Sequence, residues 1–216
     1  MFLYLIVDAA ACGGPDGSRG VVETARQAAE AGVDFIQYRD LAADDANYLA
    51  VAAQISQAID ETNAALLISE RPHLLGQTQA IGVHVGETYR DLAEARRIIG
   101  PEAMLGASGF TVQEVLDSVG PDFELDYLSV GPVWTTVSKA DAGAAIGVAE
   151  ATKRTAQNPW PTMLVGGITA GNISELANTE AAGIVVLGEI CRAPNVAEAV
   201  QALGAAIENF QLEQNH

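Results

Sequence analysis

The chain has 216 residues, of which 49% are hydrophobic and 18% are charged, so it can bury a large core and disorder is expected only in the tail. Its formal net charge of −17 argues against nucleic acid or an anionic membrane surface as a partner. An anionic substrate would therefore have to be attracted by a local cluster of positive groups.

The two cysteines, Cys12 and Cys191, form neither a disulfide-rich nor a CxxC pattern, so two reduced thiols in a cytoplasmic protein are expected. Residues 1–8 are apolar but short and lack a basic region, which argues against a signal peptide. No apolar run reaches about 18 residues, so no membrane-spanning segment is expected.

Eight short apolar runs are typical of buried parallel strands, and a helical pattern follows each of them. The strands are expected at residues 2–7, 33–38, 64–69, 81–85, 104–107, 126–130, 162–165 and 183–187. The helices are expected at residues 21–31, within 44–61, near 72–78, at 91–99, at 112–119, within 144–157, from 169 to about 179, and over about 196–210. Thr111 followed by Glu114 predicts a capping box at the start of the fifth helix.

This regular alternation predicts a parallel sheet with helices outside it. Eight units in 216 residues fit a single α/β domain, a closed (β/α)8 TIM barrel over residues 1–211 with a frayed tail at 212–216. The alternative, an open doubly wound sheet, needs an early GxGxxG turn, and the glycines at 13–17 have the wrong spacing.

Active sites of such barrels lie where the strands end. Polar residues and glycines at or just after the ends of the predicted strands are therefore expected on one rim. They are Gln37, Arg39, Ser69, Glu70, Glu87, Ser108, Thr136, Ser138, Lys139, Gly167 and Gly188.

Two features of this rim indicate anion binding. Residues 135–139 hold three hydroxyls and one ammonium after the sixth strand, and a glycine-rich stretch at 140–147 follows them. Gly166 and Gly167 after the seventh strand, with Gly188 after the eighth, would allow backbone N–H groups to approach a phosphate closely. The alternatives are a solvated loop with one surface lysine, and glycines that only turn the chain.

Seven segments together resemble the thiamine phosphate synthase family and its thiazole tautomerase relatives. They are residues 4–8, 32–39, 82–86, 94–100, 106–108, 131–139 and 165–169. The resemblance implies a transferase that joins hydroxymethylpyrimidine diphosphate to thiazole phosphate and releases pyrophosphate. It also implies a largely dissociative step, in which the diphosphate leaves with Mg²⁺ and the thiazole nitrogen attacks a pyrimidine cation.

The same resemblance assigns roles to individual residues. Arg39, Ser108 and Lys139 are the implied catalytic residues, with Arg39 holding the diphosphate as a fork. The implied substrate-binding set includes Arg39 and Ser69, with Gln37 at the pyrimidine. It also has Ser108, Thr136, Ser138 and Lys139 at the diphosphate or the thiazole-side phosphate, and Gly167 and Gly188 around the thiazole phosphate. The implied partners are small phosphorylated molecules, and a homo-oligomer is left open.

Structural roles are the alternative for several of these residues. Arg39 would pair with Asp40, Gln37 would form a polar layer inside the barrel, and Ser108 would cap a turn. His84 is interpreted as a satisfied core residue rather than a base, and Trp134 as loop packing.

The chain also departs from the family pattern. Leu41 replaces a lysine, Ser69–Glu70 replaces Asn–Asp, and Tyr89 replaces a metal-binding aspartate. Glu70 and Glu87 are therefore the expected Mg²⁺ ligands, because carboxylates suit that ion, whereas pairing of Glu70 with Arg71 or Arg39 is the alternative. A non-catalytic phosphate-binding relative is the second functional hypothesis. A tautomerase is a weaker third, because Pro132 stands where that branch has a histidine.

Overall fold

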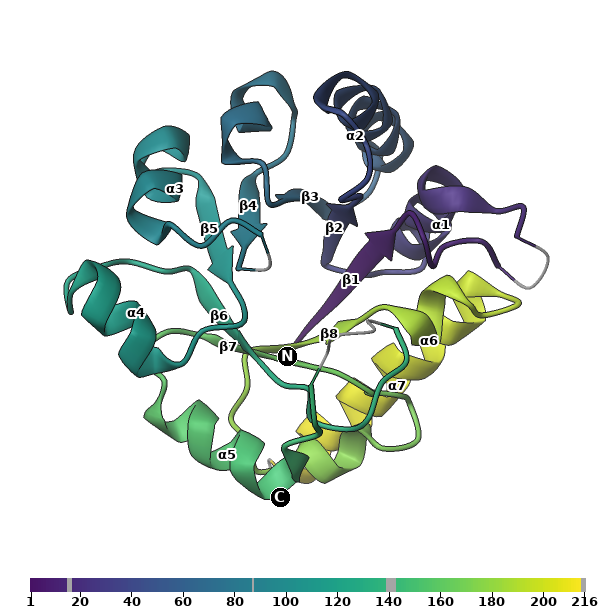
Figure 1. Ribbon diagram of the computed structural model, residues 1–216. Coiled ribbons are helices and arrows are strands. Elements are labelled where there is room, and N and C mark those ends of the chain that lie inside the picture. Colours follow the sequence, from purple (N-terminus) through teal and green to yellow (C-terminus); the bar gives the residue numbers. More distant parts are fainter. Residues whose placement is uncertain (15–16, 87, 139–142, 215–216) are drawn as a thin grey trace.

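In the computed structural model, eight parallel strands close into a barrel in chain order, as the sequence predicted (Figure 1). The structure describes residues 1–14, 17–86, 88–138 and 143–214, and gives the backbone alone for 210–214. The strands are β1 (Phe2–Asp8), β2 (Phe35–Arg39), β3 (Ala65–Ser69), β4 (Gly82–Val85), β5 (Met104–Ala107), β6 (Tyr127–Val130), β7 (Thr162–Val165) and β8 (Gly183–Val186). Because all eight are parallel, their carboxyl ends share one rim.

The helices surround the strands (Figure 1). They are α1 (Gly20–Glu30), α2 (Asp45–Ile59), η1 (Pro72–Gln77), α3 (Leu92–Ile99), α4 (Val112–Val119), α5 (Gly147–Gln157), η2 (Ile173–Leu176), α6 (Gly188–Cys191) and α7 (Val196–Gln214), where η1 and η2 are 3₁₀-helices. The capping box of Thr111 and Glu114 opens α4 as predicted. Within the described residues, no helix has the length and apolar composition needed to cross a membrane.

The core has two layers, one between the sheet and the helices and one inside the barrel. This explains why the strand sequences are continuous apolar runs. Leu5, Ile36 and Val83 are fully buried between the sheet and the helices. A smaller cluster fills the barrel interior and consists of Tyr4, Leu67, Tyr127, Met163 and Val185. Strands buried on both faces need no polar alternation.

The helical prediction was wrong after β7, and after β8 it missed α6 but found α7. A helix was expected from residue 169, but the side chain of Asn172 accepts a hydrogen bond from the Thr169 N–H (2.9 Å) and donates one to the Gly167 carbonyl (2.9 Å). This turn occupies the place of the first helical turn, so only η2 remains. The four residues of α6 are too few to show a helical period. At the other end, α7 continues to Gln214, beyond the expected end at residue 210.

The expectation of two reduced thiols was also wrong. Cys12 and Cys191 form a disulfide, with their Cα atoms 4.5 Å apart and both side chains buried. They are 179 residues apart in sequence, and only closure of β1 against β8 brings them together. The bridge ties the loop after β1 to α6.

Candidate active site

A cavity of about 570 Å³ opens at the carboxyl ends of the strands. That volume is in the range of small-molecule sites. Its walls include all nine of the predicted site residues that the structure describes. These are Gln37, Arg39, Ser69, Glu70, Ser108, Thr136, Ser138, Gly167 and Gly188. Lys139 and Glu87 lie outside the described residues.

A buried polar layer lies below this cavity, inside the barrel. The Tyr4 hydroxyl donates to Oε1 of Gln37 (2.9 Å), and Nε2 of Gln37 donates to the Ser69 hydroxyl (2.6 Å). Gln37 is only 3% exposed. The interior polar layer considered for Gln37 is therefore present, and the same side chain also lines the cavity.

The polar layer continues to the opposite side of the barrel. The Tyr4 and Tyr127 hydroxyls are 2.8 Å apart, Nδ1 of His84 lies 2.9 Å from the Tyr127 hydroxyl, and Nε2 of His84 lies 2.9 Å from Oγ of Ser108. Burial raises the pKa of both phenols, Tyr4 and Tyr127, so both remain protonated donors at neutral pH.

The donors and acceptors in this layer can be assigned in order, starting from Gln37. Tyr4 donates to Gln37, so Tyr127 donates to Tyr4 and its oxygen then accepts from Nδ1–H of His84. A neutral His84 ring is left with Nε2 as acceptor for the Ser108 hydroxyl. Both ring nitrogens are therefore bonded, which agrees with the interpretation of His84 as a satisfied residue. Ser108 bonds to His84 instead of capping a turn, and its hydroxyl is oriented at the cavity wall.

Arg39 forms an ion pair with a different partner from the one considered. Its Nη1 contacts Oδ2 of Asp8 at the end of β1, whereas Oδ1 of Asp40 accepts from the Ala42 and Ala43 N–H groups (both 3.0 Å). Asp8 is 4% exposed. The buried carboxylate therefore orients the Arg39 guanidinium, which also lines the cavity.

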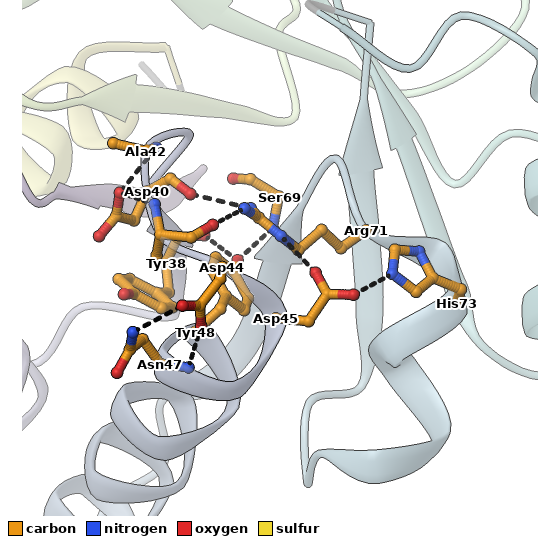
Figure 2. Close-up of polar contacts among 11 residues, drawn as sticks. Tyr38, Asp40, Ala42, Asp44, Asp45, Asn47, Tyr48, Ser69, Arg71 and His73 are labelled. Carbon is orange, nitrogen blue, oxygen red and sulfur yellow. Dashed lines mark hydrogen bonds and ion pairs between the residues drawn. The ribbon is translucent and has the colours of Figure 1, made fainter.

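The loop after β2 is held by Arg71, as Figure 2 shows. Its guanidinium donates to the carbonyls of Asp40 (2.8 Å) and Ala43 (2.6 Å) and stacks 4.3 Å from the centre of the Tyr48 ring. The Tyr48 hydroxyl in turn donates to the Tyr38 carbonyl (2.7 Å). Arg71 therefore positions the loop that directly follows Arg39.

Glu70 ties the loop after β4 to the end of β3. It has a left-handed backbone (φ 61°), and its Oε2 accepts from the N–H groups of Thr88 (3.0 Å) and Tyr89 (2.6 Å). Within the described residues, no group of three His, Cys, Asp or Glu side chains gathers to hold a metal ion. Glu70 is thus the one expected Mg²⁺ ligand among the described residues, and the second, Glu87, lies outside them.

The glycine loop after β7 packs directly on the loop after β6. Gly166 and Gly167 have φ of 99° and 67°, and the Gly166 carbonyl accepts from the Trp134 N–H (3.0 Å). A Cβ on Gly167 would lie 2.7 Å from Cβ of Trp134, so only glycine fits. No described residue accepts a hydrogen bond from the Gly167 N–H, which therefore remains a donor at the cavity wall.

Sequence reasoning missed several residues at this site. Tyr4 and Tyr127 escaped notice because aromatic residues in apolar runs look like core. Arg192 follows α6, lines the cavity with Glu189, and donates from Nη2 to Oγ of Ser138 (2.9 Å). A cation four residues after Gly188 was the available signal for Arg192.

Comparison with known proteins finds relatives of one family over most of the chain. The family model described as "Thiamine monophosphate synthase" matches residues 3–190. The chain is 32% identical to a thiamine-phosphate synthase of Azorhizobium caulinodans over 95% of this chain and 94% of the relative. It is 34% identical to one of Desulfitobacterium hafniense, over 87% and 88%. A solved thiamine phosphate pyrophosphorylase of Pyrococcus furiosus superposes with a TM-score of 0.81 at 26% identity, covering 97% of this chain and 96% of that one. The chain therefore belongs to the thiamine monophosphate synthase family.

Proposed function

We propose that this chain is a thiamine-phosphate synthase, a transferase that joins hydroxymethylpyrimidine diphosphate to thiazole phosphate and releases pyrophosphate. The observation that carries the proposal is the shared cavity, because nine residues collected from six strand ends line it. The relatives that match nearly the whole chain have the same activity in their names.

The diphosphate is proposed to bind near Arg39. This guanidinium is oriented by Asp8 and lines the cavity with a side chain that is 21% exposed. In the reaction the carbon–oxygen bond to the diphosphate breaks, and pyrophosphate keeps the electron pair. Positive charge beside the leaving group lowers the cost of that separation, so Arg39 acts on the departing oxygens.

The thiazole phosphate is proposed to bind on the opposite side, between the loops after β6, β7 and β8. The Gly167 N–H and the Ser138 hydroxyl are donors for its phosphate oxygens. The thiazole nitrogen then forms the new carbon–nitrogen bond with its lone pair. This step needs orientation and little proton transfer.

Gln37 and Ser108 are proposed to contact the pyrimidine between these two anion sites. Their orientation supports this role, since Tyr4 and Ser69 hold the Gln37 amide and His84 holds the Ser108 hydroxyl. Fixed dipoles of this kind stabilise a developing cation without reorganising. Pro132 lines the cavity without an ionisable group, which favours the transferase over the tautomerase.

Magnesium dependence stays a prediction. When bound, Mg²⁺ would neutralise charge on the departing diphosphate. Glu70 would be its ligand among the described residues, and no step above is routed through the ion. A cytoplasmic location and a homo-oligomer also stay predictions, and the buried disulfide is of a kind more frequent in oxidising compartments.

The direct test is an assay of the purified chain with both substrates and Mg²⁺. We expect thiamine phosphate and pyrophosphate in equal amounts, no product when either substrate is omitted, and less product with excess chelator. Arg39→Ala should lower kcat/KM by about 100-fold, because a charge-assisted hydrogen bond to the leaving group is lost.

Arg97→Ala is the matched control, since Arg97 is an exposed cation on α3 that pairs with Glu94. It changes the net charge by the same amount and should keep wild-type turnover. Tight binding of thiazole phosphate with no turnover would contradict the transferase and support a non-catalytic binder.

A further inference from the structure

Arg192 is the one described cavity-lining cation on the β8 side of the site. It follows α6 directly, and its Nη2 donates to Oγ of Ser138 (2.9 Å) in the loop after β6. The guanidinium therefore spans the gap between the β6 and β8 loops, where the phosphate of the second substrate is proposed to bind.

Gly188 makes room for this guanidinium. A Cβ built on Gly188 would lie 1.9 Å from Nη2 of Arg192 and 2.5 Å from Oγ of Ser138. Both distances are far below van der Waals contact, so any side chain at position 188 would displace Arg192 from the cavity. Glycine at position 188 therefore leaves space for the Arg192 guanidinium, in addition to letting the backbone approach a phosphate closely.

The backbone that carries Arg192 is held from both sides by the loop after β1. The Arg19 guanidinium donates to the carbonyls of Cys191 (2.7 Å) and Ala193 (2.9 Å), the residues that flank Arg192. The disulfide of Cys191 with Cys12 fixes the same turn. Arg192 is therefore presented from a rigid base, which reduces the entropic cost of binding a ligand.

The charge of Arg192 is not neutralised within the described residues. No ion pair joins it to a carboxylate there, although Glu189 lines the same cavity. Only one of its N–H donors, on Nη2, has a side-chain acceptor in this part of the chain. An arginine has five donors in a fork that matches phosphate oxygens, so most of them remain for a ligand. In a chain of net charge −17, such a group supplies the local attraction that an anion requires.

We propose that Arg192 is the guanidinium ligand of the phosphate monoester on the thiazole substrate, and that it determines selection of the phosphorylated thiazole over the free alcohol. The proposal rests on the proposed function. Arg192 binds the phosphate together with Ser138 and the Gly167 N–H, and it does not contact the diphosphate of the other substrate.

The test compares Arg192→Ala with wild type in steady-state kinetics and in binding. The KM for thiazole phosphate should rise about 10- to 100-fold, the expected effect of losing a hydrogen-bonded charge. The KM for the pyrimidine diphosphate should stay within about twofold, and the preference for thiazole phosphate over the alcohol should shrink by the same 10- to 100-fold factor. Arg192→Lys should recover only part of the loss, because an ammonium lacks the planar fork.

Inorganic phosphate provides a readout that does not need turnover. Phosphate should raise the Tm of wild type and of Arg97→Ala, which has the same charge change, but raise that of Arg192→Ala much less. Gly188→Ser should reproduce the Arg192→Ala effect, and the double variant should be no worse than either single one.

These results distinguish failure of the proposed function from failure of the Arg192 assignment. If wild type shows no turnover but phosphate stabilises it through Arg192, the proposed function fails and the anion ligand stands. If Arg192→Ala binds phosphate and thiazole phosphate as wild type does, or if the KM for the diphosphate rises instead, the assignment of Arg192 is wrong.

Discussion

The two sides of the cavity rim differ in what positions their anion-binding groups. On the β1 to β4 side, the charged groups are fixed by partners within the chain. Arg39 pairs with Asp8, Glu70 accepts from the loop at 88–89, and Arg71 holds the loop at 40–43. Leu41, Ser69 and Tyr89, at which the sequence resemblance implies other residues, all fall on this side.

On the β6 to β8 side, the backbone conformation at two glycines forms the site. Gly167 leaves an N–H donor at the wall, and Gly188 leaves space for Arg192. Side chains that act through pairs can change if their partners change, whereas a backbone donor in a left-handed loop allows almost no substitution. From this difference we expect the first side to accept a change in one side chain when its partner changes with it, and the second side to reject a side chain at Gly167 or Gly188.

Gly167→Ala should have the largest effect. The new Cβ would lie 2.7 Å from Cβ of Trp134 and 2.8 Å from the Thr135 carbonyl, at a φ of 67°. The loops after β6 and β7 would separate, so we expect kcat/KM for thiazole phosphate to fall by at least about 100-fold. Gly171→Ala in the same loop is the control, because its Cβ would find only one atom at 3.8 Å. Equal activity of the two variants would show that the site does not depend on the absence of a side chain at Gly167.

Arg71→Ala tests whether the other side depends on indirect positioning. Two hydrogen bonds to loop carbonyls and the contact with Tyr48 would be lost, so we expect a destabilisation of about 2 kcal/mol and a KM for the diphosphate roughly 10-fold higher. The KM for thiazole phosphate should not change. Asp45→Asn weakens only exposed contacts, to Arg71 (3.3 Å) and to His73 (3.0 Å), so it should leave the Tm and both KM values near wild type. Denaturant unfolding and kinetics with each substrate measure these effects.

Tyr127→Phe tests the hydrogen-bonded layer at the cavity floor, which joins the two sides. It removes the hydroxyl between Tyr4 and His84, so Ser108 is no longer held in one orientation. We expect a loss of about 1 to 2 kcal/mol in unfolding free energy and about a 10-fold lower kcat. In a double-mutant cycle with Ser108→Ala the two losses should not add. Full additivity would show that the hydrogen-bonded layer does not act through Ser108.

The smallest effect concerns pH. Burial raises the pKa of Tyr4 and Tyr127, so the folded chain keeps protons that the unfolded chain releases above pH 10. The stability that these phenols contribute is complete below pH 10 and is lost as pH rises toward their folded pKa values, at most about 1.4 kcal/mol per pH unit for each group. Urea unfolding between pH 8 and 11 should show this slope, and Tyr127→Phe should reduce it. An unchanged slope in the variant would contradict the buried, protonated phenol.

Local patterns in the sequence determined the barrel and the membership of its rim. Apolar runs of strand length, helical periods and the glycines after β7 and β8 all depend on neighbouring residues, so they can be recognised without contacts. The nine described site residues could be collected in this way, because strand ends of a parallel barrel must share one face. Their proposed contacts with each substrate are still predictions.

Tertiary structure decided the partners of these residues. Arg39 pairs with Asp8 rather than Asp40, Glu70 binds the loop at 88–89, and Arg192 reaches Ser138 across 54 residues of sequence. The disulfide of Cys12 with Cys191 spans 179 residues. Each of these contacts depends on barrel closure and loop conformation, which bring distant segments within a few ångströms and leave no periodic signal in the chain. The sequence therefore determined nine residues of the rim, whereas the closed barrel decided their partners and added Tyr4 and Arg192 to the cavity wall.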